Sequence, residues 1–346
     1  MTGQADGTGA EPAVRLSVLD RSRVREGYPA AAAVRETVAF AQWAEQLGYH
    51  RFWVAEHHGV PGVAGSAPTV LAAAVAGATS RIRVGTGGVM LPNHQPLVVA
   101  EQFGVLAALF PERIDMGLGR SVAFTDGVRR ALGREKDAAD RFAEQITELL
   151  AYFDGTGRSR TDVHARPAEG LTVPAFVLAT GTGADLAAAA GLPLVIGGLR
   201  GEEKMVEAID RYRSGFRPSA QAARPYVVIS GNVAVAETTE AAQRLLVSEA
   251  WSTAYSRTHG EFPPLAPESD VLSRSMTPRE QAAFQQAVTG QIAGTPDRAA
   301  AEVRGLLART GADEFLVTTH AYDRPALHES YRLLAQALGL PLVEKP

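Results

Sequence analysis

Three side chains that can do chemistry stand together in this sequence: Glu56, His57 and His58, which follow the apolar run RFWVA. A carboxylate beside two imidazoles could bind a metal ion or exchange protons with a bound molecule. Neighbouring residues of a strand point to opposite faces, so the two imidazoles should diverge. No H-x-H or H-E-x-x-H pattern accompanies them. The sequence therefore predicts no metal site and leaves two interpretations, acid/base chemistry or a purely structural strand end.

Two other polar stretches follow predicted strands. In LPNHQPL, His94 could contact a substrate, or it could belong to a turn that caps the next helix. In ATGTGAD, backbone amides and hydroxyl groups could surround an anion at the start of a helix, although glycine-rich turns also occur for steric reasons alone. The residues of this candidate anion site are Thr180, Gly181, Thr182 and Gly183.

The composition is that of a globular protein. The 346 residues are 46% hydrophobic and include no Cys, which excludes disulfides, thiolate catalysis and Cys-ligated metals. A net charge of −4 gives no reason to expect nucleic acid or an anionic membrane as a partner. No apolar run approaches the ~18 residues of a membrane span, and the start of the chain lacks the features of a signal peptide. We therefore expect a cytoplasmic protein with a disordered tail over residues 1–13 and a single domain over 14–346.

Short apolar segments alternate with helical patterns along the chain. Strands are predicted at 14–20, 51–55, 81–91, 112–120, 173–183, 193–198, 225–236 and 313–319. Such alternation predicts a parallel sheet, and eight units in this length favour a (β/α)8 TIM barrel. A doubly wound open sheet is the alternative fold, but the first turn lacks the G-x-G-x-x-G fingerprint of dinucleotide-binding sheets.

One segment departs from this alternation. Residues 258–292, after the seventh predicted strand, are polar, rich in Pro and long for a connection within a compact domain. Their position would place them over the mouth of a barrel. We interpret them as a lid insertion, and surface padding without a role is the alternative.

Two acidic residues lie within apolar segments, Glu101 in a predicted helix and Asp115 in a predicted strand. A buried carboxylate needs a partner, because leaving a charge unpaired in the interior is costly. Arg81, Arg83 and Arg113 are the candidate partners, and we predict a structural role for both carboxylates.

Four longer stretches, taken in order, resemble the bacterial luciferase-like flavin-dependent monooxygenases: FWVAEHHG, IRVGTGGVMLPNHQPLVVAEQ, RIDMGLGR and GTPDRAAAEVRGLLARTGADEFLVTT. The stretch GGVMLPNHQPL is most like the subgroup found in actinobacterial secondary metabolism. The resemblance implies a barrel that binds reduced FMN at its C-terminal mouth, reacts it with O2 and protects a flavin-4a-hydroperoxide from water. A long, partly apolar lid would suit a bulky substrate, such as a polyketide-type intermediate of antibiotic biosynthesis.

The resemblance also implies which residues hold the FMN phosphate, a dianion that needs donors and positive charge. Arg120, just after the fourth predicted strand, matches the family's phosphate arginine. Arg141 matches a second arginine that some members have. The turn at residues 180–183 matches a family segment that mostly contains serines, so its threonines and glycines imply a different pattern of hydrogen bonds.

Further residue roles follow from the same resemblance. The position of His57 carries a histidine that faces the flavin and acts as acid/base, which makes His57 the predicted catalytic residue. The family has a non-prolyl cis peptide at the position of Gly87 and Gly88, under the flavin ring, and a simple β-bulge is the alternative. His94 and Phe124 are the predicted substrate contacts.

The resemblance finally implies partners. A separate flavin reductase would supply reduced FMN as a co-substrate, and the second and third helices, which are rich in small and apolar residues, would form a homodimer. Two other functions stay open: a deazaflavin-dependent hydride-transfer oxidoreductase on the same barrel, and a flavin-binding protein without catalysis.

Overall fold

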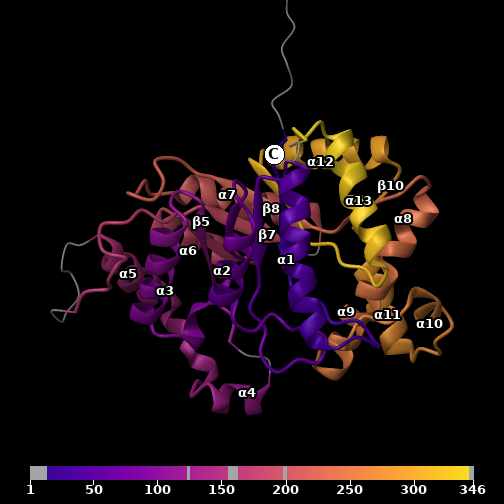
Figure 1. The fold of residues 1–346 in the computed structure, drawn as a ribbon, viewed down its shortest axis with the longest axis horizontal. Helices are drawn as coiled ribbons and strands as arrows, with labels where there is room; N and C mark the ends of the chain where they lie inside the picture. Colours follow the sequence, from indigo (N-terminus) through magenta and orange to yellow (C-terminus); the bar gives the residue numbers. More distant parts are fainter. Residues whose placement is uncertain (1–13, 123–124, 155–162, 198–200, 343–346) are drawn as a thin grey trace, which may run out of the picture.

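The computed structural model describes residues 14–122, 125–154, 163–197 and 201–342, and these residues form a closed parallel barrel (Figure 1). The barrel strands are β1 (Leu16–Asp20), β2 (Arg51–Val54), β3 (Arg83–Thr86), β5 (Ile114–Gly119), β6 (Ala175–Ala179), β7 (Leu194–Gly197), β8 (Val227–Gly231) and β11 (Glu314–Val317). The pairings of β1 with β11 and of β3 with β5 close the ring. A short strand, β4 (Val89–Met90), continues the third position beyond Gly88. The eight predicted strands and the (β/α)8 barrel are confirmed.

Helices surround this ring of strands (Figure 1). They are α1 (Ala30–Gln46), α2 (Pro68–Ala78), α3 (Pro96–Leu109), α5 (Phe142–Phe153), α6 (Gly183–Ala190), α7 (Glu202–Gly215), α12 (Pro296–Thr310) and α13 (Arg324–Ala337), with the short η1 (Leu91–Asn93), α4 (Asp126–Ala131) and η2 (Lys136–Arg141) between them. Proline occupies the first turn of α2, α3 and α12, where its missing N–H costs nothing. Among the described residues, no helix is both long and apolar enough to cross a membrane.

Side chains alternate between two apolar clusters along the strands. Phe52 and Val54 pack in the large core between barrel and helices, whereas Trp53 packs with Phe176 and Val228 in a separate cluster. Because successive residues of a strand point to opposite faces, the second cluster fills the barrel interior. This packing confirms that successive side chains of RFWVA point to opposite faces of the strand.

The predicted lid region contains regular structure. After α8 (Thr239–Leu245) and α9 (Val247–His259), the chain forms α10 (Glu268–Leu272) and α11 (Pro278–Val288), which pack on α9 around Trp251 and Phe284. Residues after α11 form β10 (Ile292–Gly294), which pairs with β9 (Val233–Val235). Figure 1 shows α9, α10 and α11 gathered on the side of the molecule opposite α3 and α5. The insertion therefore contains helices of its own, of which α11 agrees with the spacing in QAAFQQAV. The lid role stays a prediction.

A buried charge network occupies the amino-terminal end of the barrel. Arg51, the first residue of β2, donates to Asp115 at 2.6 Å and to Glu314 at 3.1 Å, and Arg83 donates to Asp115 at 2.6 Å. Burial alone would lower the pKa of Arg51, but the two carboxylates outweigh it and raise the pKa. The predicted pairing of Asp115 with Arg83 is confirmed. Arg51 was not foreseen as a partner, and Arg113 instead donates to backbone carbonyls at the end of α2.

We expect Asp115→Ala to lower the free energy of unfolding by about 3–5 kcal/mol, because it removes one of the two carboxylates that neutralise the buried Arg51 guanidinium and also the carboxylate partner of Arg83. Urea denaturation measures this change. The matched control is Glu329→Ala, which breaks the ion pair with Arg332 on the solvent side of α13 and should cost at most about 1 kcal/mol. Equal losses in the two variants would contradict the structural role of Asp115.

Candidate active site

A cavity of about 650 Å³ opens at the carboxyl ends of β5 and β6. Arg120 follows β5 directly, and it lines this cavity together with Thr180, Thr182 and Gly183, which follow β6. β5 and β6 are hydrogen-bonded parallel neighbours, so the residues after them meet at one rim. Met90, at the end of β4, extends the lining toward the next part of the rim. The structure thus brings together Arg120 and most of the predicted anion turn.

The Arg120 guanidinium is held by surface groups that a stronger anion could replace. Its Nε donates to the carbonyl oxygen of Ala139 at 3.0 Å, and it pairs with the Asp140 carboxylate at 3.1 Å. The Arg120 side chain is 46% exposed and that of Asp140 is 75% exposed, so water screens this pair. The arginine therefore lies beside the cavity without a buried partner of its own.

The threonine–glycine turn forms the start of α6. Thr182 is the residue before the helix, and its side chain makes no capping hydrogen bond. A Cβ on Gly183 would lie 2.8 Å from Cβ of Ala179, so only glycine fits at this close approach. The first backbone amides of α6 already donate within the turn, to the carbonyl oxygens of residues 180–182. The threonine hydroxyls that line the cavity are therefore what this turn offers to an anion.

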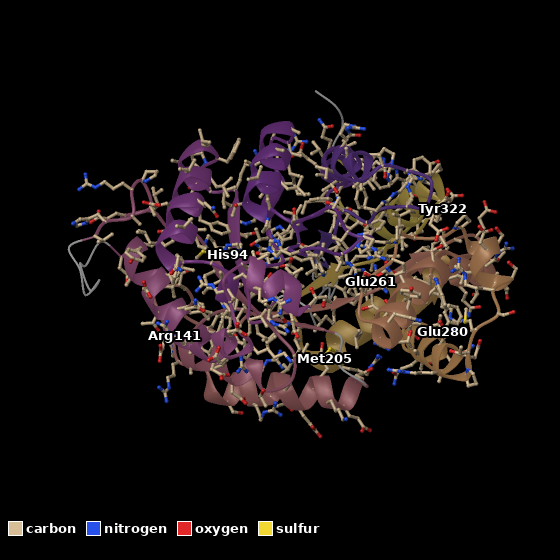
Figure 2. All side chains as sticks on the ribbon, turned by 90° about the horizontal axis from the view of Figure 1, so that it is seen from below. His94, Arg141, Met205, Glu261, Glu280 and Tyr322 are labelled. Carbon is tan, nitrogen blue, oxygen red and sulfur yellow. The ribbon has the colours of Figure 1, made fainter. Side chains whose placement is uncertain are left out.

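Other predicted residues lie elsewhere. The Arg141 side chain is 70% exposed, pairs with Glu144 at 3.3 Å and is absent from the cavity lining. Gly181 has a positive φ of 57° and does not line the cavity either. Figure 2, which views the molecule from below relative to Figure 1, shows His94 nearer the middle of this face than Arg141. Phe124 lies outside the described residues.

The Gly87–Gly88 peptide is cis, as the sequence predicted. The packing also explains both glycines. A Cβ on Gly88 would lie 2.7 Å from the carbonyl oxygen of Gly117, and one on Gly87 would lie 2.6 Å from Cδ1 of Leu19. Both positions require glycine because residues of β5 and β1 lie too close to leave room for a Cβ.

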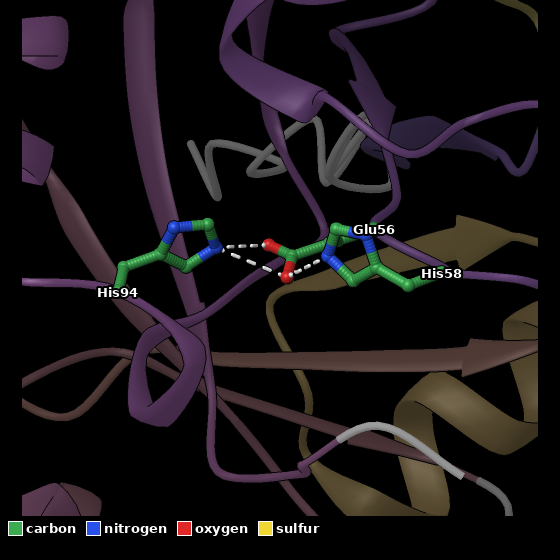
Figure 3. Close-up of side chains that lie close together, drawn as sticks. All are labelled: Glu56, His58 and His94. Atoms are coloured by element: carbon green, nitrogen blue, oxygen red, sulfur yellow. Dashed lines mark hydrogen bonds and ion pairs between the residues drawn. The ribbon is translucent and has the colours of Figure 1, made fainter. Parts of the chain in front are cut away.

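Glu56 is the centre of a polar cluster at the ends of β2 and β4 (Figure 3). It is only 2% exposed, and its carboxylate accepts hydrogen bonds from Nε2 of His58 at 2.8 Å and Nε2 of His94 at 2.9 Å. The backbone N–H of Met90 at 3.0 Å and Nδ2 of Asn93 at 3.2 Å complete the set. Burial alone would raise the pKa of Glu56, but the hydrogen bonds from the two imidazoles outweigh it and lower the pKa to about 2.

This cluster bears on the prediction of no metal site. Glu56 is buried, and it belongs with His58 to one hydrogen-bonded group. That prediction did not consider His94, which together with Glu56 and His58 offers three possible ligand atoms within 4.8 Å of one another. In this arrangement, however, the carboxylate accepts from both Nε2 atoms, so each must carry a proton. The hydrogen bonds favour a proton-binding cluster.

His57 lies apart from its neighbours, as the strand geometry predicted. Its ring packs edge-on against Phe262 of the insertion, with ring centroids 6.1 Å apart. Burial, reinforced by the positive charges of Arg21 and Arg23, lowers the pKa of His57 to about 3. Desolvation penalises the imidazolium, so this environment favours the neutral ring. His57 can act here as a neutral hydrogen-bonding group, and its catalytic role stays a prediction.

A second charged cluster at the mouth was missed by the sequence analysis. Arg21 pairs with the buried carboxylate of Glu249 at 2.6 Å, and Arg23 Nε lies 3.3 Å from the same carboxylate. Burial lowers the pKa of Arg23 to about 10. The available signal was LDRSRVREG, in which two arginines directly follow the first strand, but their partner lies more than 200 residues away on α9.

A larger cavity of about 750 Å³ adjoins the first. It lies between β8, α7, α12 and the helices of the insertion, and its lining includes Asn232, Glu249 and Thr253. Gly197 and Ser230 line both cavities, so the two spaces meet at the ends of β7 and β8. The mouth therefore has room for more than one bound molecule.

The pKa shifts predict that acid destabilises the fold. The unfolded chain binds a proton at His57 below its ordinary pKa of 6.5, whereas the folded chain does so only near 3, so the stability from this group is lost as the pH falls below 6.5. Glu56 adds a further loss below its ordinary 4.5. We expect urea denaturation to show a loss of at most about 1.4 kcal/mol per pH unit for each group. In His57→Gln, the free energy of unfolding should fall less steeply between about pH 6.5 and pH 5 than in the wild type. The exposed His164→Gln should leave this slope unchanged. Identical slopes in His57→Gln and the wild type would contradict the low pKa of His57.

Comparison with known proteins assigns the family. A family model described as luciferase-like monooxygenase matches residues 14–314. The chain is 35% identical to the luciferase-like monooxygenase of Escherichia coli (strain K12), over 92% of this chain and 96% of the relative. The crystal structure of apo-MsnO8 has a TM-score of 0.85 and 33% identity, and the match covers 95% of this chain and 100% of that one.

Two more distant solved structures share the fold alone. They are the FMN complex of the oxygenating constituent of 3,6-diketocamphane monooxygenase from Pseudomonas putida (TM-score 0.71, 17% identity, 96% and 100% coverage) and an F420-dependent secondary alcohol dehydrogenase with an F420–acetone adduct (TM-score 0.71, 14% identity, 94% and 99% coverage). The full-length matches and the family model agree with the barrel fold. The chain belongs to the luciferase-like monooxygenase family.

Proposed function

We propose that this protein is an FMN-dependent monooxygenase that uses reduced FMN and O2 to insert one oxygen atom into an organic substrate. The observation that supports this most is the meeting of Arg120 with the threonine–glycine turn around one cavity, in a barrel of the monooxygenase family. A separate flavin reductase would supply the reduced FMN. The second cavity of about 750 Å³ favours a bulky substrate, and we propose a natural-product intermediate of the polyketide type.

The residues around the first cavity fit the FMN phosphate. Arg120 would exchange its screened pair with Asp140 for the phosphate dianion, and the hydroxyl groups of Thr180 and Thr182 would donate to the remaining oxygens. Bound reduced FMN would supply the electrons that activate O2. The chain's own part is to anchor the phosphate and to place neutral His57 at the mouth as a hydrogen-bonding group.

We expect Arg120→Ala to weaken FMN binding by roughly 10- to 100-fold, because a charge-assisted hydrogen bond to phosphate contributes about 1.5–3 kcal/mol. Quenching of flavin fluorescence measures the dissociation constant. Riboflavin, which lacks the phosphate, should bind the variant and the wild type equally. The control is Arg332→Ala, which removes an arginine from an exposed ion pair on α13. Equal losses for FMN and riboflavin would show that Arg120 does not bind the phosphate.

The reaction class is tested by admitting O2 to the protein loaded with reduced FMN. We expect O2 consumption and a slower return of the oxidised flavin spectrum than for FMN free in solution, because the site excludes water. Binding of a reduced deazaflavin without O2 consumption would favour the hydride-transfer alternative. Flavin binding without any effect on the oxygen reaction would favour a flavin-binding protein without catalysis.

We also propose a homodimer that forms through α2 and α3. The two helices are joined by a hydrogen bond between Thr69 and Gln102, and their outer side carries unusual exposed apolar surface. Val98, Val105 and Leu109 share one face of α3 and are 44%, 47% and 64% exposed, and Val70 of α2 is 70% exposed. Burial of such a patch against a second copy removes it from water.

We expect Val105→Asp to convert the dimer to a monomer in sedimentation velocity. Each protomer would otherwise bury an unpaired carboxylate in an apolar interface. The control is Leu272→Asp, which adds the same charge at a 59% exposed apolar residue on α10. A wild-type monomer at micromolar concentration would contradict the proposal.

A further inference from the structure

We propose that His94, held by the buried carboxylate of Glu56, is the acid/base group of the oxygenation site, with His58 as a second imidazole on the same carboxylate. The inference rests on the proposed function, because it assigns a proton-transfer residue to that reaction. It moves this task from His57, the residue that the family resemblance suggests, to the opposite side of the Glu56 segment.

The hydrogen bonds fix the state of both rings. An ionised carboxylate only accepts hydrogen bonds, so Nε2 of His94 at 2.9 Å and Nε2 of His58 at 2.8 Å both carry protons. The lone pair of each neutral ring is then on Nδ1. No hydrogen bond to either Nδ1 is found among the described residues, and the side chains of His58 and His94 are 21% and 29% exposed. Each ring can therefore accept a proton at Nδ1 while Glu56 holds it in place.

The position of His94 suits a bound flavin. Met90 lines the same cavity as Arg120, and its backbone N–H donates to the carboxylate of Glu56. Nε2 of His94 donates to the same carboxylate, so the His94 ring lies near Met90 at the edge of the cavity without being part of its lining. A flavin anchored by its phosphate at the ends of β5 and β6 would have to extend along the rim toward the end of β4 to approach this ring.

The surrounding charges separate His94 from His57. Nε2 of His94 faces the Glu56 carboxylate at 2.9 Å. The other charged group in contact with this segment is Arg134, which donates to the backbone oxygen of His94 at 3.0 Å. His57 instead faces Arg21 and Arg23, whose charges oppose protonation and contribute to its lowered pKa. The two imidazoles thus face opposite charges, a carboxylate at His94 and two guanidinium groups at His57.

The proton balance defines the step. Oxidation of anionic reduced FMN by O2 to FMN and H2O2 consumes one proton. His94 would supply that proton from Nδ1 of its imidazolium and would then take one back from water at its exposed edge. In oxygenation, one oxygen atom would go to the substrate and the other would leave as water; this net reaction also consumes one proton, which the same ring would supply. Glu56 takes no proton in either case and acts as the positioning residue.

The first experiment uses the protein without flavin, labelled with ¹⁵N-histidine for NMR. We expect His58 and His94 to show the tautomer protonated at Nε2, assigned by comparison with His58→Gln and His94→Gln. In Glu56→Gln, the two rings should no longer be restricted to this tautomer, because an amide can donate a hydrogen bond as well as accept one. Protonation at Nδ1 in the neutral rings, or stoichiometric binding of a divalent metal that is lost in His94→Gln, would overturn the inference.

The second experiment follows the release of H2O2 from reduced FMN bound to the protein after O2 is admitted. We expect His94→Gln to slow it by ~10²-fold or more with an unchanged FMN dissociation constant. Added imidazole should restore the rate of His94→Ala, and more basic imidazoles should restore it further. The control is His164→Gln, which alters an exposed histidine–carboxylate pair with Glu169.

The outcomes separate this inference from the function on which it rests. An active wild type together with an equally active His94→Gln variant overturns the role of His94 and leaves the proposed function standing. A wild type that binds no reduced FMN, or that does not consume O2 with it, overturns the proposed function itself.

Discussion

Closure of the parallel barrel is the constraint on which the rest of this structure depends. Because all eight strands run in one direction and β3 pairs with β5 while β1 pairs with β11, every strand ends at the same rim. Residues that are far apart in the sequence, such as Arg120 and Thr182, therefore line one cavity. Each strand has only to deliver one or two polar residues beyond its last hydrogen bond for a composite site to form.

The two ends of the barrel solve the same electrostatic problem in different ways. At the amino-terminal end, the buried carboxylates of Asp115 and Glu314 are neutralised by Arg51, whose charge does not change over the ordinary pH range. At the mouth, the buried carboxylate of Glu56 is satisfied by two imidazoles and an amide. Arginine gives a permanent structural link, whereas histidine leaves a group that can gain or lose a proton.

The stretch EHHG shows how far pattern analysis can go at a strand end. Alternation along β2 correctly predicted that the two adjacent histidines diverge. It could not predict that Glu56 would be buried. The hydrogen bonds that offset the cost of burying this carboxylate come from β4 and η1. It also could not predict the low pKa of His57, which depends on desolvation by Phe262 and its neighbours in a separate insertion.

The sequence by itself determined the eight strands, the barrel, the family and the placement of Arg120 and the threonine–glycine turn after neighbouring strands. These features follow from local periodicity and from short motifs, in which the informative residues are close together in the chain. Only the tertiary structure decided which charges pair, as with Arg51 and Asp115 or Arg21 and Glu249, and which imidazole lies against a carboxylate. Pairing and pKa depend on distance and burial in three dimensions, which the spacing of residues along a chain does not encode.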